Sequence, residues 1–383
     1  MVAGGEIRIL VAGGGTAGHV SPGLAILDAL NQRFGSARGA LALSARWMGS
    51  SRIEAQIVPA AGVSFAEIDI RFSYRLPVPR NWGYYRQHIL PLALGRPFSQ
   101  ALSVLRTFAP CVVIGTGGYV AAPALWAAAH LGIPYALVQL DAKPGLVNWH
   151  FAPGAWRVYA STERVAQAFA GRASLSKLRV HGFPVQRVRR SRSTVLSELG
   201  IDPARRVVLA MGGSLGAGAV HRAVRELLFA AARDRDSRWS QVAVLSIGGE
   251  REHLAGDLLN PGVLPAGPMT CHHTGYFAHA IDAVAAADFY IGRSGAASVG
   301  ELIAQGPPAL LVPDPQHSDR QQYANAELLV ERGQGTVVDQ REVSGVGLLA
   351  WLRDVWDQPR CPPPHPPAAQ AIAADLACLW EGK

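Results

Sequence analysis

The sequence predicts an α/β protein with parallel sheets, built from repeated strand–turn–helix units. Short apolar runs rich in β-branched residues end in turns of glycine and other small residues, and a helical pattern follows each turn. Units of this kind recur in both halves of the chain, and 383 residues are enough for two domains of ordinary size. We therefore expect two α/β domains, each with a parallel sheet.

The composition is that of a globular chain, because 49% of the residues are hydrophobic and 17% are charged. The net charge of +8 favours an anionic partner, which means nucleic acid, an acidic membrane or a phosphorylated substrate. The four cysteines have no metal-ligand spacing, which indicates a reducing compartment and no disulfide framework. No apolar run reaches the roughly 18 residues of a membrane span, and the chain enters a strand at once, so we expect no signal peptide.

The first unit has a strand from Ile7 to Ala12, a glycine turn up to Gly18, and a helix expected from about Pro22 to Phe34. A strand, a glycine turn and a helix start together suggest phosphate binding. A bound NAD is disfavoured, because the segment from Leu41 to Trp47 lacks the acidic residue that would hold its ribose.

His19 follows this turn and is a candidate general base, because histidine titrates near neutrality. The four small residues before it place it at the crest of the loop, within reach of a hydroxyl. The alternative is a histidine that only caps the helix. Farther along, Gly49, Ser50 and Ser51 followed by Glu54 predict the capped start of another helix.

A basic and aromatic segment extends from Arg71 to Phe98, with five arginines and no acidic residue. Arginine among aromatic residues suits single-stranded nucleic acid or an anionic membrane surface, and the apolar stretch from Ile89 to Leu94 favours the membrane. The alternative is a core helix with basic ends. The residues expected to contact the membrane are Trp82, Leu90, Leu92 and Leu94.

A second glycine turn follows the strand from Cys111 to Gly115 and precedes a helix from Pro123 to His130. The next strand runs from Pro134 to Gln139. Several helix N-termini in one domain suit an acceptor that carries a diphosphate. The residues of this turn are Gly117, Gly118 and Tyr119.

The second half begins with a basic run, Arg187, Arg189, Arg190 and Arg192, which we predict to be a solvated linker face. A strand from Arg206 to Met211 then leads into a glycine turn of the phosphate-binding type, which contains Gly213 and Ser214. Another strand is expected from Val242 to Ile247.

The most informative stretch runs from Ala287 to Asn325 and has the pattern strand, small-residue turn, helix, strand, polar loop, helix. Backbone N–H groups at such a helix start favour a diphosphate. Glu301, one turn into the helix, can accept two ribose hydroxyls. The alternative is an ordinary βαβ unit with a solvated loop. Three amides that suit sugar hydroxyls come next: Gln321, Gln322 and Asn325.

Three motifs together resemble the MurG family, transferases that add N-acetylglucosamine to lipid I in peptidoglycan synthesis. They are GGTAGHVSPGLAI at the first turn, GTGGYV at the second, and RSGAASVGE with PALLVP and HSDRQQYANA in the second half. The resemblance extends to about Val338. It implies two Rossmann-like domains facing across a cleft, the GT-B glycosyltransferase fold, with the UDP-sugar held mainly by the C-terminal domain.

The resemblance also implies the domain limits. Residues 1–186 form the domain that faces the acceptor and the membrane, and residues 187–360 form the donor-binding domain. Residues 361–383 form a proline-rich linker and a helix that packs back on the N-terminal domain.

At matching positions, the resemblance makes His19 the catalytic base. The donor-binding residues it implies are Thr16, Gly18, Arg187, Gly213, Ser214, Phe277, Ala296, Ala297, Ser298, Glu301, Gln321, Gln322 and Asn325. The acceptor-binding residues are Gly117, Gly118, Tyr119, Asp141 and Asn148. No cofactor beyond the UDP-N-acetylglucosamine substrate and no metal site are expected, because no aspartate pair of a metal-anchored nucleotide-sugar site is evident.

Two places depart from the family pattern. Val138 to Asp141 stand where the family usually has His-Glu-Gln-Asn, which leaves the acceptor open. Gln186 stands where the family has an arginine that meets the donor diphosphate, and the adjacent Arg187 is the expected substitute.

The predicted reaction is inverting transfer of N-acetylglucosamine from its UDP donor to the muramyl C4 hydroxyl of lipid I, which forms lipid II. The expected partners are UDP-N-acetylglucosamine, undecaprenyl-linked lipid I and the anionic inner-membrane surface, with no nucleic acid. The expected location is the cytoplasmic face of the bacterial cell membrane, as a peripheral protein. The alternatives are a UDP-sugar transferase acting on another lipid or natural-product acceptor, and a UDP-N-acetylglucosamine epimerase.

Overall fold

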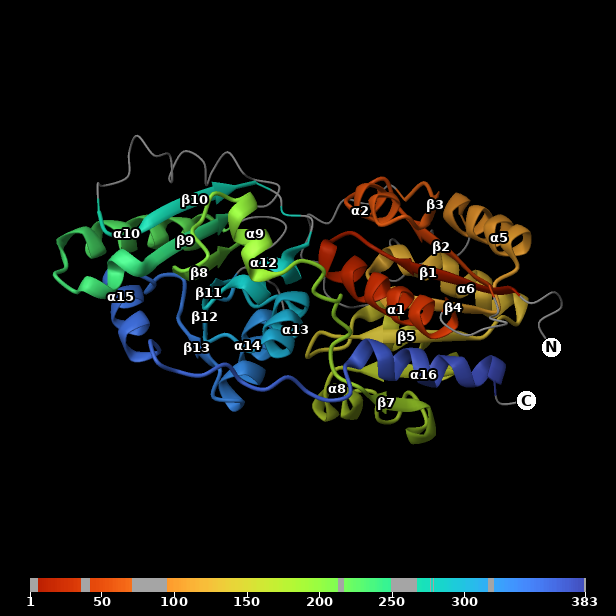
Figure 1. Cartoon of the computed structure of the whole chain (residues 1–383). Coiled ribbons are helices and arrows are strands. Elements are labelled where there is room, and N and C mark those ends of the chain that lie inside the picture. The colour runs from red at the N-terminus through yellow and green to blue at the C-terminus, as the bar shows by residue number, and fades with distance from the viewer. Residues whose placement is uncertain are drawn as a thin grey trace. The chain divides into compact units, whose positions relative to one another are not determined.

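The computed structural model describes residues 6–35, 42–70, 95–212, 217–248, 267–275, 277, 279–315 and 320–381. The chain divides into two compact units, and we call them the first unit (Met1–Gln186 with His365–Lys383) and the second unit (Arg187–Pro364). Both units are α/β, as the sequence predicts (Figure 1).

The described residues of the first unit form one sheet of seven strands, and every neighbouring pair is parallel. Its order is β3-β2-β1-β4-β5-β6-β7, so the order reverses between β1 and β4. In sheets of this kind, ligands bind outside the carboxyl ends of the strands at such a reversal. The strands are β1 (Glu6–Gly13), β2 (Ala42–Gly49), β3 (Ser64–Glu67), β4 (Val112–Gly117), β5 (Tyr135–Gln139), β6 (Arg157–Ala160) and β7 (Leu178–Val180).

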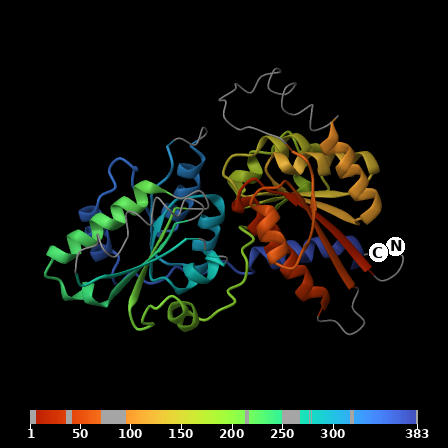
Figure 2. The same ribbon diagram turned by 90° about the horizontal axis from the view of Figure 1, so that it is seen from above.

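Helices cover both faces of this sheet (Figure 2). In α5 the buried residues Pro97, Ala101, Leu105 and Phe108 are three or four positions apart, the spacing of one helix face turned to a core. The described helices of this unit are α1 (Ala17–Gly35), α2 (Glu54–Ala60), α5 (Arg96–Phe108), α6 (Ala122–Leu131), α7 (Leu146–Phe151), α8 (Glu163–Gln167) and α16 (Ala368–Glu381), with 3₁₀ turns η2 (Tyr119–Ala121), η3 (Ala152–Gly154) and η4 (Leu175–Lys177).

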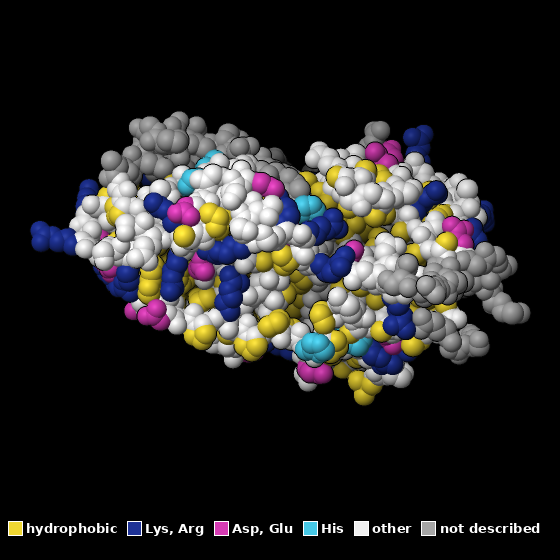
Figure 3. Space-filling view, in the orientation of Figure 1, with side chains coloured by type: hydrophobic (Ala, Val, Ile, Leu, Met, Phe, Trp, Pro, Cys, Tyr) yellow, Lys and Arg dark blue, Asp and Glu magenta, His cyan; other side chains and the backbone are white. Residues whose placement is uncertain are grey.

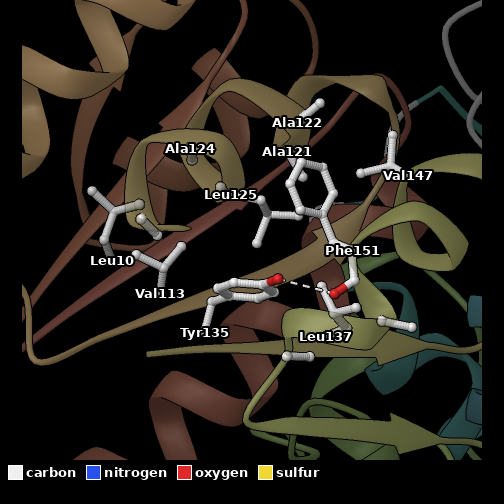
Figure 4. Packing of buried hydrophobic residues seen from close by; sticks show 14 of the residues in the cluster. Leu10, Val113, Ala121, Ala122, Ala124, Leu125, Tyr135, Leu137, Val147 and Phe151 are labelled. Carbon is white, nitrogen blue, oxygen red and sulfur yellow. Dashed lines mark hydrogen bonds between the residues drawn. The ribbon is translucent and has the colours of Figure 1, made fainter. Parts of the chain in front are cut away.

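The core of the first unit lies around β4 and β5, in which every residue is buried. Strands with both faces covered are mostly apolar, and these two are so except for the buried Thr116 and Gln139 near their carboxyl ends. Tyr135 lies inside this core, where its hydroxyl donates to the Phe151 carbonyl at 3.0 Å (Figure 4). Because a buried hydroxyl without a partner is costly, this bond fixes the end of α7 on β5.

The second unit repeats the same plan with six described strands, in the order β10-β9-β8-β11-β12-β13, again all parallel. The strands are β8 (Arg206–Met211), β9 (Val242–Ile247), β10 (Thr270–Thr274), β11 (Phe289–Gly292), β12 (Ala309–Leu311) and β13 (Gly335–Val337). The described helices are α9 (Arg192–Glu198), α10 (Gly218–Arg233), α12 (Ala280–Ala286), α13 (Ala296–Gln305), α14 (Gln321–Glu331) and α15 (Gly345–Asp354), with the 3₁₀ turn η5 (Ser237–Gln241). Both sheets contain the strand order of the Rossmann fold, so the prediction of two Rossmann-like domains is confirmed.

One predicted helix boundary is wrong, and the error concerns His19. Helix α1 begins at Ala17 and not near Pro22, which lies inside the helix. The chain completes its turn at Gly15, whose φ of 86° favours glycine, and is helical soon afterwards. His19 therefore lies in the first turn of a helix and not at the crest of a loop.

The last helix, α16, packs against α1 within the first unit, where Phe34 and Trp380 meet edge to face with ring centroids 6.0 Å apart. A second anchor joins this helix to β6. The Asp375 carboxylate pairs with Arg157 at 3.1 Å and accepts from the Tyr159 hydroxyl at 2.9 Å. Burial raises the pKa of Tyr159, so this hydroxyl remains a donor.

Replacing Asp375 by Asn should lower the free energy of unfolding by about 1–3 kcal/mol, because the buried Tyr159 hydroxyl and Arg157 lose a charged acceptor. Urea denaturation of the purified protein measures this change. Gln370→Ala, at an exposed position of the same helix, is the matched control and should change little. An unchanged midpoint in Asp375→Asn would show that this carboxylate does not hold α16.

Candidate functional site

His19 is held by the backbone of the glycine turn that precedes it. Its Nδ1 lies 3.0 Å from the Gly14 carbonyl oxygen and 3.4 Å from the Thr16 hydroxyl. Because a carbonyl oxygen can only accept, Nδ1 carries the hydrogen in this bond and Nε2 keeps its lone pair. The neutral ring is thereby held in the tautomer that can take a proton at Nε2.

The second glycine turn lies against the ring of His19. Gly117 and Gly118 have φ values of 103° and 75°, which favour glycine. A methyl group on Gly117 would come within 3.0 Å of His19 Cδ2, and one on Gly118 within 2.6 Å of the Gly14 carbonyl oxygen. Tyr119 beside them is buried, and burial raises the pKa of its phenol. The two turns therefore form one site around His19, where the strand order reverses between β1 and β4.

The segment after β2 does not form the capped helix start that the sequence suggested. Helix α2 begins at Glu54 itself, and Ile53 before it provides no side-chain cap. The fully buried Glu54 carboxylate instead accepts from the N–H and hydroxyl of Ser50, at 3.0 and 2.6 Å, and from the Gly15 N–H at 2.9 Å. The acidic side chain thus reaches back to the first glycine turn, because the small residues there leave room for it.

This carboxylate occupies one of the N–H groups that phosphate binding at the first turn would use, and the expectation of such binding stays a prediction. The Gly15 N–H, which would face an anion, is bonded to Glu54, and a methyl group on Gly14 would overlap the same carboxylate. A phosphate placed there would be repelled by the existing negative charge. Thr16 and Gly18 lie half-buried beside this turn, and their role in donor binding stays a prediction.

The loop after β5, predicted to bind the acceptor, is organised by Gln139. Its side-chain nitrogen donates to the carbonyls of Asp141 and Lys143, at 2.9 and 3.0 Å. The buried Asn148 donates to the Val138 carbonyl at 2.9 Å and to Gln139 Oε1 at 3.0 Å. Asn148 therefore supports this loop from inside, and its contact with the acceptor stays a prediction.

In the second unit, the turn between β11 and α13 places a helix start of small residues at the carboxyl end of a strand. The first helical residues are Ala296, Ala297 and Ser298. The first N–H groups of a helix have no acceptor within the helix, so this start has the donors that a diphosphate needs. The Ser294 hydroxyl donates to the Gln322 carbonyl at 2.8 Å and joins the turn to α14.

Glu301 is the buried acid of this helix, with only 8% of its surface exposed. Among the residues that the structure describes it forms no hydrogen bond or ion pair, although it interacts electrostatically with the Tyr290 phenol, and burial raises its pKa to about 7. A buried carboxyl group without a protein partner is costly unless a ligand provides one. Its position therefore supports the prediction that it receives ribose hydroxyls.

The three amides of α14 have different surroundings. Gln322 accepts the Asp314 N–H through Oε1 at 2.9 Å, and the buried Asn325 donates to the Ser294 carbonyl at 3.3 Å. Gln321 is half-buried at the first position of the helix. Gln322 and Asn325 thus support the loop and turn of the donor half, and a contact of these three amides with the sugar stays a prediction.

The basic run after Gln186 is not simply the solvated face that the sequence predicted. The Arg190 Nε donates to the fully buried Asp282 at 2.9 Å, and its guanidinium lies 4.9 Å from the centre of the Phe277 ring. Asp282 also accepts from the Arg189 N–H at 2.8 Å. A buried carboxylate needs such partners, and the acid within the apolar run AIDAVAA is the signal that would have revealed it. Arg187 is exposed, and its role at the diphosphate stays a prediction.

Some predicted residues lie outside the described part of the chain: Gly213 and Ser214 of the donor turn, and Trp82, Leu90, Leu92 and Leu94 of the membrane segment. Among the described helices, none is long and apolar enough to cross a membrane. The described residues include no group of three or more His, Cys, Asp or Glu side chains placed to hold a metal ion. On the face in Figure 3, Lys and Arg side chains are interspersed with hydrophobic and polar ones over both units.

Comparison with known sequences decides the family. The chain is 33% identical over 357 residues to a UDP-N-acetylglucosamine--N-acetylmuramyl-(pentapeptide) pyrophosphoryl-undecaprenol N-acetylglucosamine transferase of Desulforudis audaxviator, with 92% of this chain and 91% of the relative covered. It is 35% identical over 366 residues to the transferase of the same name from Serratia proteamaculans, with 92% and 90% covered. The chain belongs to this transferase family. Two protein-family models agree with this assignment. The glycosyltransferase family 28 N-terminal domain matches residues 9–160, and the glycosyltransferase family 28 C-terminal domain matches residues 207–377. The predicted resemblance to MurG is confirmed, and the protein is a glycosyltransferase.

Solved structures share the fold. A crystal structure of MurG from Acinetobacter baumannii has a TM-score of 0.64 and 22% identity, over 97% of this chain and 98% of that chain. A putative UDP-N-acetylglucosamine 2-epimerase from Listeria monocytogenes has a TM-score of 0.66 and 13% identity, over 99% and 97%. At these identities the likeness shows the fold alone, so transferase and epimerase are separated by the sequence relatives and not by the shape.

The raised pKa of Glu301 predicts that its replacement by Gln should make the protein more stable but weaken its binding of the donor. Between its ordinary pKa of 4.5 and about 7, the folded protein keeps a proton that the unfolded chain has lost, so stability falls as the pH rises through this window. Glu301→Gln removes this cost and should raise the free energy of unfolding at pH 8 by on the order of 2–3 kcal/mol, with little effect at pH 4. The same change should weaken UDP-N-acetylglucosamine binding by roughly 10- to 100-fold, because an amide is a poorer acceptor for ribose hydroxyls.

Chemical denaturation at both pH values and titration calorimetry with UDP-N-acetylglucosamine measure the two effects. Glu331→Gln, at an exposed position on α14, is the control and should change neither. A Glu301→Gln protein that is less stable at pH 8 and binds the donor normally would make Glu301 a structural residue.

Proposed function

We propose that this protein transfers N-acetylglucosamine from UDP-N-acetylglucosamine to the muramyl C4 hydroxyl of lipid I, with inversion at the anomeric carbon, and so forms lipid II. The observation that carries this proposal is membership, along 92% of the chain, of a family whose members are named for this transfer. Those names specify a UDP-N-acetylglucosamine donor and an N-acetylmuramyl-(pentapeptide) pyrophosphoryl-undecaprenol acceptor.

The first unit supplies the base in this proposal. The acceptor hydroxyl attacks the anomeric carbon of the donor sugar, and the bond from that carbon to the UDP oxygen breaks, so UDP leaves with the bonding electrons. The hydroxyl proton goes to Nε2 of His19, whose Nδ1 is held on the Gly14 carbonyl. A base oriented in this way contributes roughly 10²–10⁴-fold to the rate.

The second unit supplies the donor site. The diphosphate lies at the N-terminus of α13, where backbone N–H groups meet the negative charge that develops on the leaving UDP. The Glu301 carboxylate accepts the ribose hydroxyls, which supply the partners that the described residues do not. Phe277, held by its contact with Arg190, lies in the part of the chain that the family resemblance assigns to the uracil.

One observation favours a second candidate, a UDP-sugar transferase of the same kind that acts on another lipid or natural-product acceptor. The segment from Val138 to Asp141 departs from the family pattern, and its loop is organised by Gln139. A different loop on the acceptor side would change which hydroxyl is presented to His19 and leave donor binding unchanged.

We also propose that the protein acts as a peripheral enzyme at the cytoplasmic face of the bacterial cell membrane, because the undecaprenyl chain of its acceptor resides in that membrane. The basic and apolar segment at 71–98 supports binding to an anionic surface. Nucleic acid is not a proposed partner, because the arginines of this segment lie among apolar residues. No cofactor beyond the sugar nucleotide is proposed, since the sequence has no evident aspartate pair for a metal-anchored nucleotide sugar.

Incubation of the purified protein with UDP-N-acetylglucosamine and lipid I should yield lipid II, detected by mass spectrometry of the lipid product. His19→Ala should lower kcat by roughly 10²–10⁴-fold. Donor affinity should stay near wild type, because the groups proposed for the diphosphate at α13 and for the ribose lie in the second unit. His130→Ala, at an exposed histidine of α6, is the control and should behave as wild type.

A panel of other lipid and natural-product acceptors in the same assay tests the second candidate, and added EDTA tests the proposed independence of metal. If N-acetylglucosamine is transferred only to another acceptor, that acceptor takes the place of lipid I as the proposed substrate. Epimerised UDP-sugar without any transfer would contradict both candidates.

Binding to vesicles should require anionic lipid and should weaken as salt is added, because each basic residue at an anionic surface contributes about 1 kcal/mol that salt screens. Combined replacement of Trp82, Leu92 and Leu94 by Ser should release the protein from vesicles in a flotation assay. Turnover of a soluble acceptor analogue should continue in this variant. Tight, salt-independent binding to neutral vesicles would contradict the electrostatic part of the proposal.

A further inference from the structure

The first glycine turn is held from two sides by buried side chains that the proposed mechanism does not yet use. The Trp47 indole N–H donates to the Gly13 carbonyl at 2.9 Å, and the Glu54 carboxylate accepts the Gly15 N–H at 2.9 Å. Trp47 and Glu54 are both completely buried. Gly14, whose carbonyl accepts from His19, lies between the two tethered residues.

A carboxylate is an unusual choice for this buried position. Glu54 forms no ion pair with the residues that the structure describes, and its oxygens are occupied by Ser50 and by the Gly15 N–H. A hydrocarbon side chain would fill the space without the cost of removing a charge from water. What the carboxylate does, and a hydrocarbon cannot, is to bond the end of β2 and the glycine turn at the same time.

The geometry of the turn links this tether to His19. Gly15 has a φ of 86° and belongs to a run of glycines, so the backbone here has wide conformational freedom when nothing holds it. Fixing the Gly15 N–H on Glu54 fixes the Gly14–Gly15 peptide plane, and with it the direction of the Gly14 carbonyl. That carbonyl accepts from His19 Nδ1 at 3.0 Å and selects the tautomer with a lone pair on Nε2.

We propose that Glu54 is a positioning residue for the transfer reaction, one that acts through the Gly14–Gly15 peptide to keep His19 in the tautomer and orientation of a base. The kinetic part of this inference rests on the proposed function. The structural part, that Glu54 sets the tautomer of His19, concerns the free protein and does not depend on the substrate.

Glu54→Gln is the decisive variant, because it keeps the shape of the side chain and changes its hydrogen bonding. The amide oxygen can still accept from Ser50, but the amide NH₂ then faces the Gly15 N–H, and two donors cannot bond. We expect kcat to fall by roughly 10²-fold, as for small misplacements of a catalytic group, with the KM for UDP-N-acetylglucosamine unchanged. Asp375→Asn, which removes a half-buried, hydrogen-bonded carboxylate elsewhere in the first unit, is the matched control and should lose stability without loss of kcat.

Two further measurements separate positioning from a purely structural role. In a double-mutant cycle, Glu54→Gln should lower kcat in the wild type but cause no further loss in a His19→Ala background, because its effect passes through His19. In ¹⁵N-histidine NMR spectra of the free protein, His19 should be the Nδ1–H tautomer in the wild type. Glu54→Gln should show a mixture of tautomers.

Additive losses of kcat in the double mutant, or an unchanged His19 tautomer in Glu54→Gln, would overturn the proposal. If Glu54→Gln does not fold, Glu54→Asp takes its place, since it keeps the charge but is one methylene too short to reach Ser50 and Gly15 together. If the wild type transfers nothing to lipid I, the proposed function fails, and the NMR comparison still decides whether Glu54 sets the tautomer.

Discussion

The hydrogen bond between His19 Nδ1 and the Gly14 carbonyl is the interaction on which the site of the first unit depends. It requires β1 and β4 to be neighbours, so that the turn after one strand meets the turn after the other. It requires Gly117 and Gly118 to lack side chains, because a methyl group on either would crowd the ring or the carbonyl. The parallel sheet, the strand order and the glycines are thus all conditions for orienting one imidazole.

The fold could be predicted from the sequence because its signals are local: apolar strands, glycine turns and helical patterns. Local patterns also singled out His19 and Glu301 as candidates, since each lies just after a turn at the end of a strand. They failed where the partner is distant in the chain. Glu54 resembles a helix-capping acid, and only the folded sheet brings it to Gly15, 39 residues away. Arg190 and Asp282 are 92 residues apart and gave no joint signal for the same reason.

Three buried acidic side chains of the two units differ in whether the protein supplies them with hydrogen-bond donors. Glu54 and Asp282 are surrounded by donors from the protein itself, so they stabilise the backbone near them. Glu301 is also buried but has no such donor among the described residues, and burial raises its pKa. Buried carboxylates with protein donors stabilise the chain near them, whereas one without such donors lowers stability when it is ionised.

The anchoring of α16 bears on how the protein is made. This helix completes the first unit although the whole second unit precedes it in the chain, and Asp375 meets Tyr159 across 216 residues. On the ribosome, β6 must therefore wait for its partner until the whole second unit has been synthesised, whereas the segments of the second unit emerge consecutively and can fold first. A chain cut short before α16 would carry His19 on an unfinished domain. Helix α16 thus makes completion of the first unit depend on prior synthesis of the second.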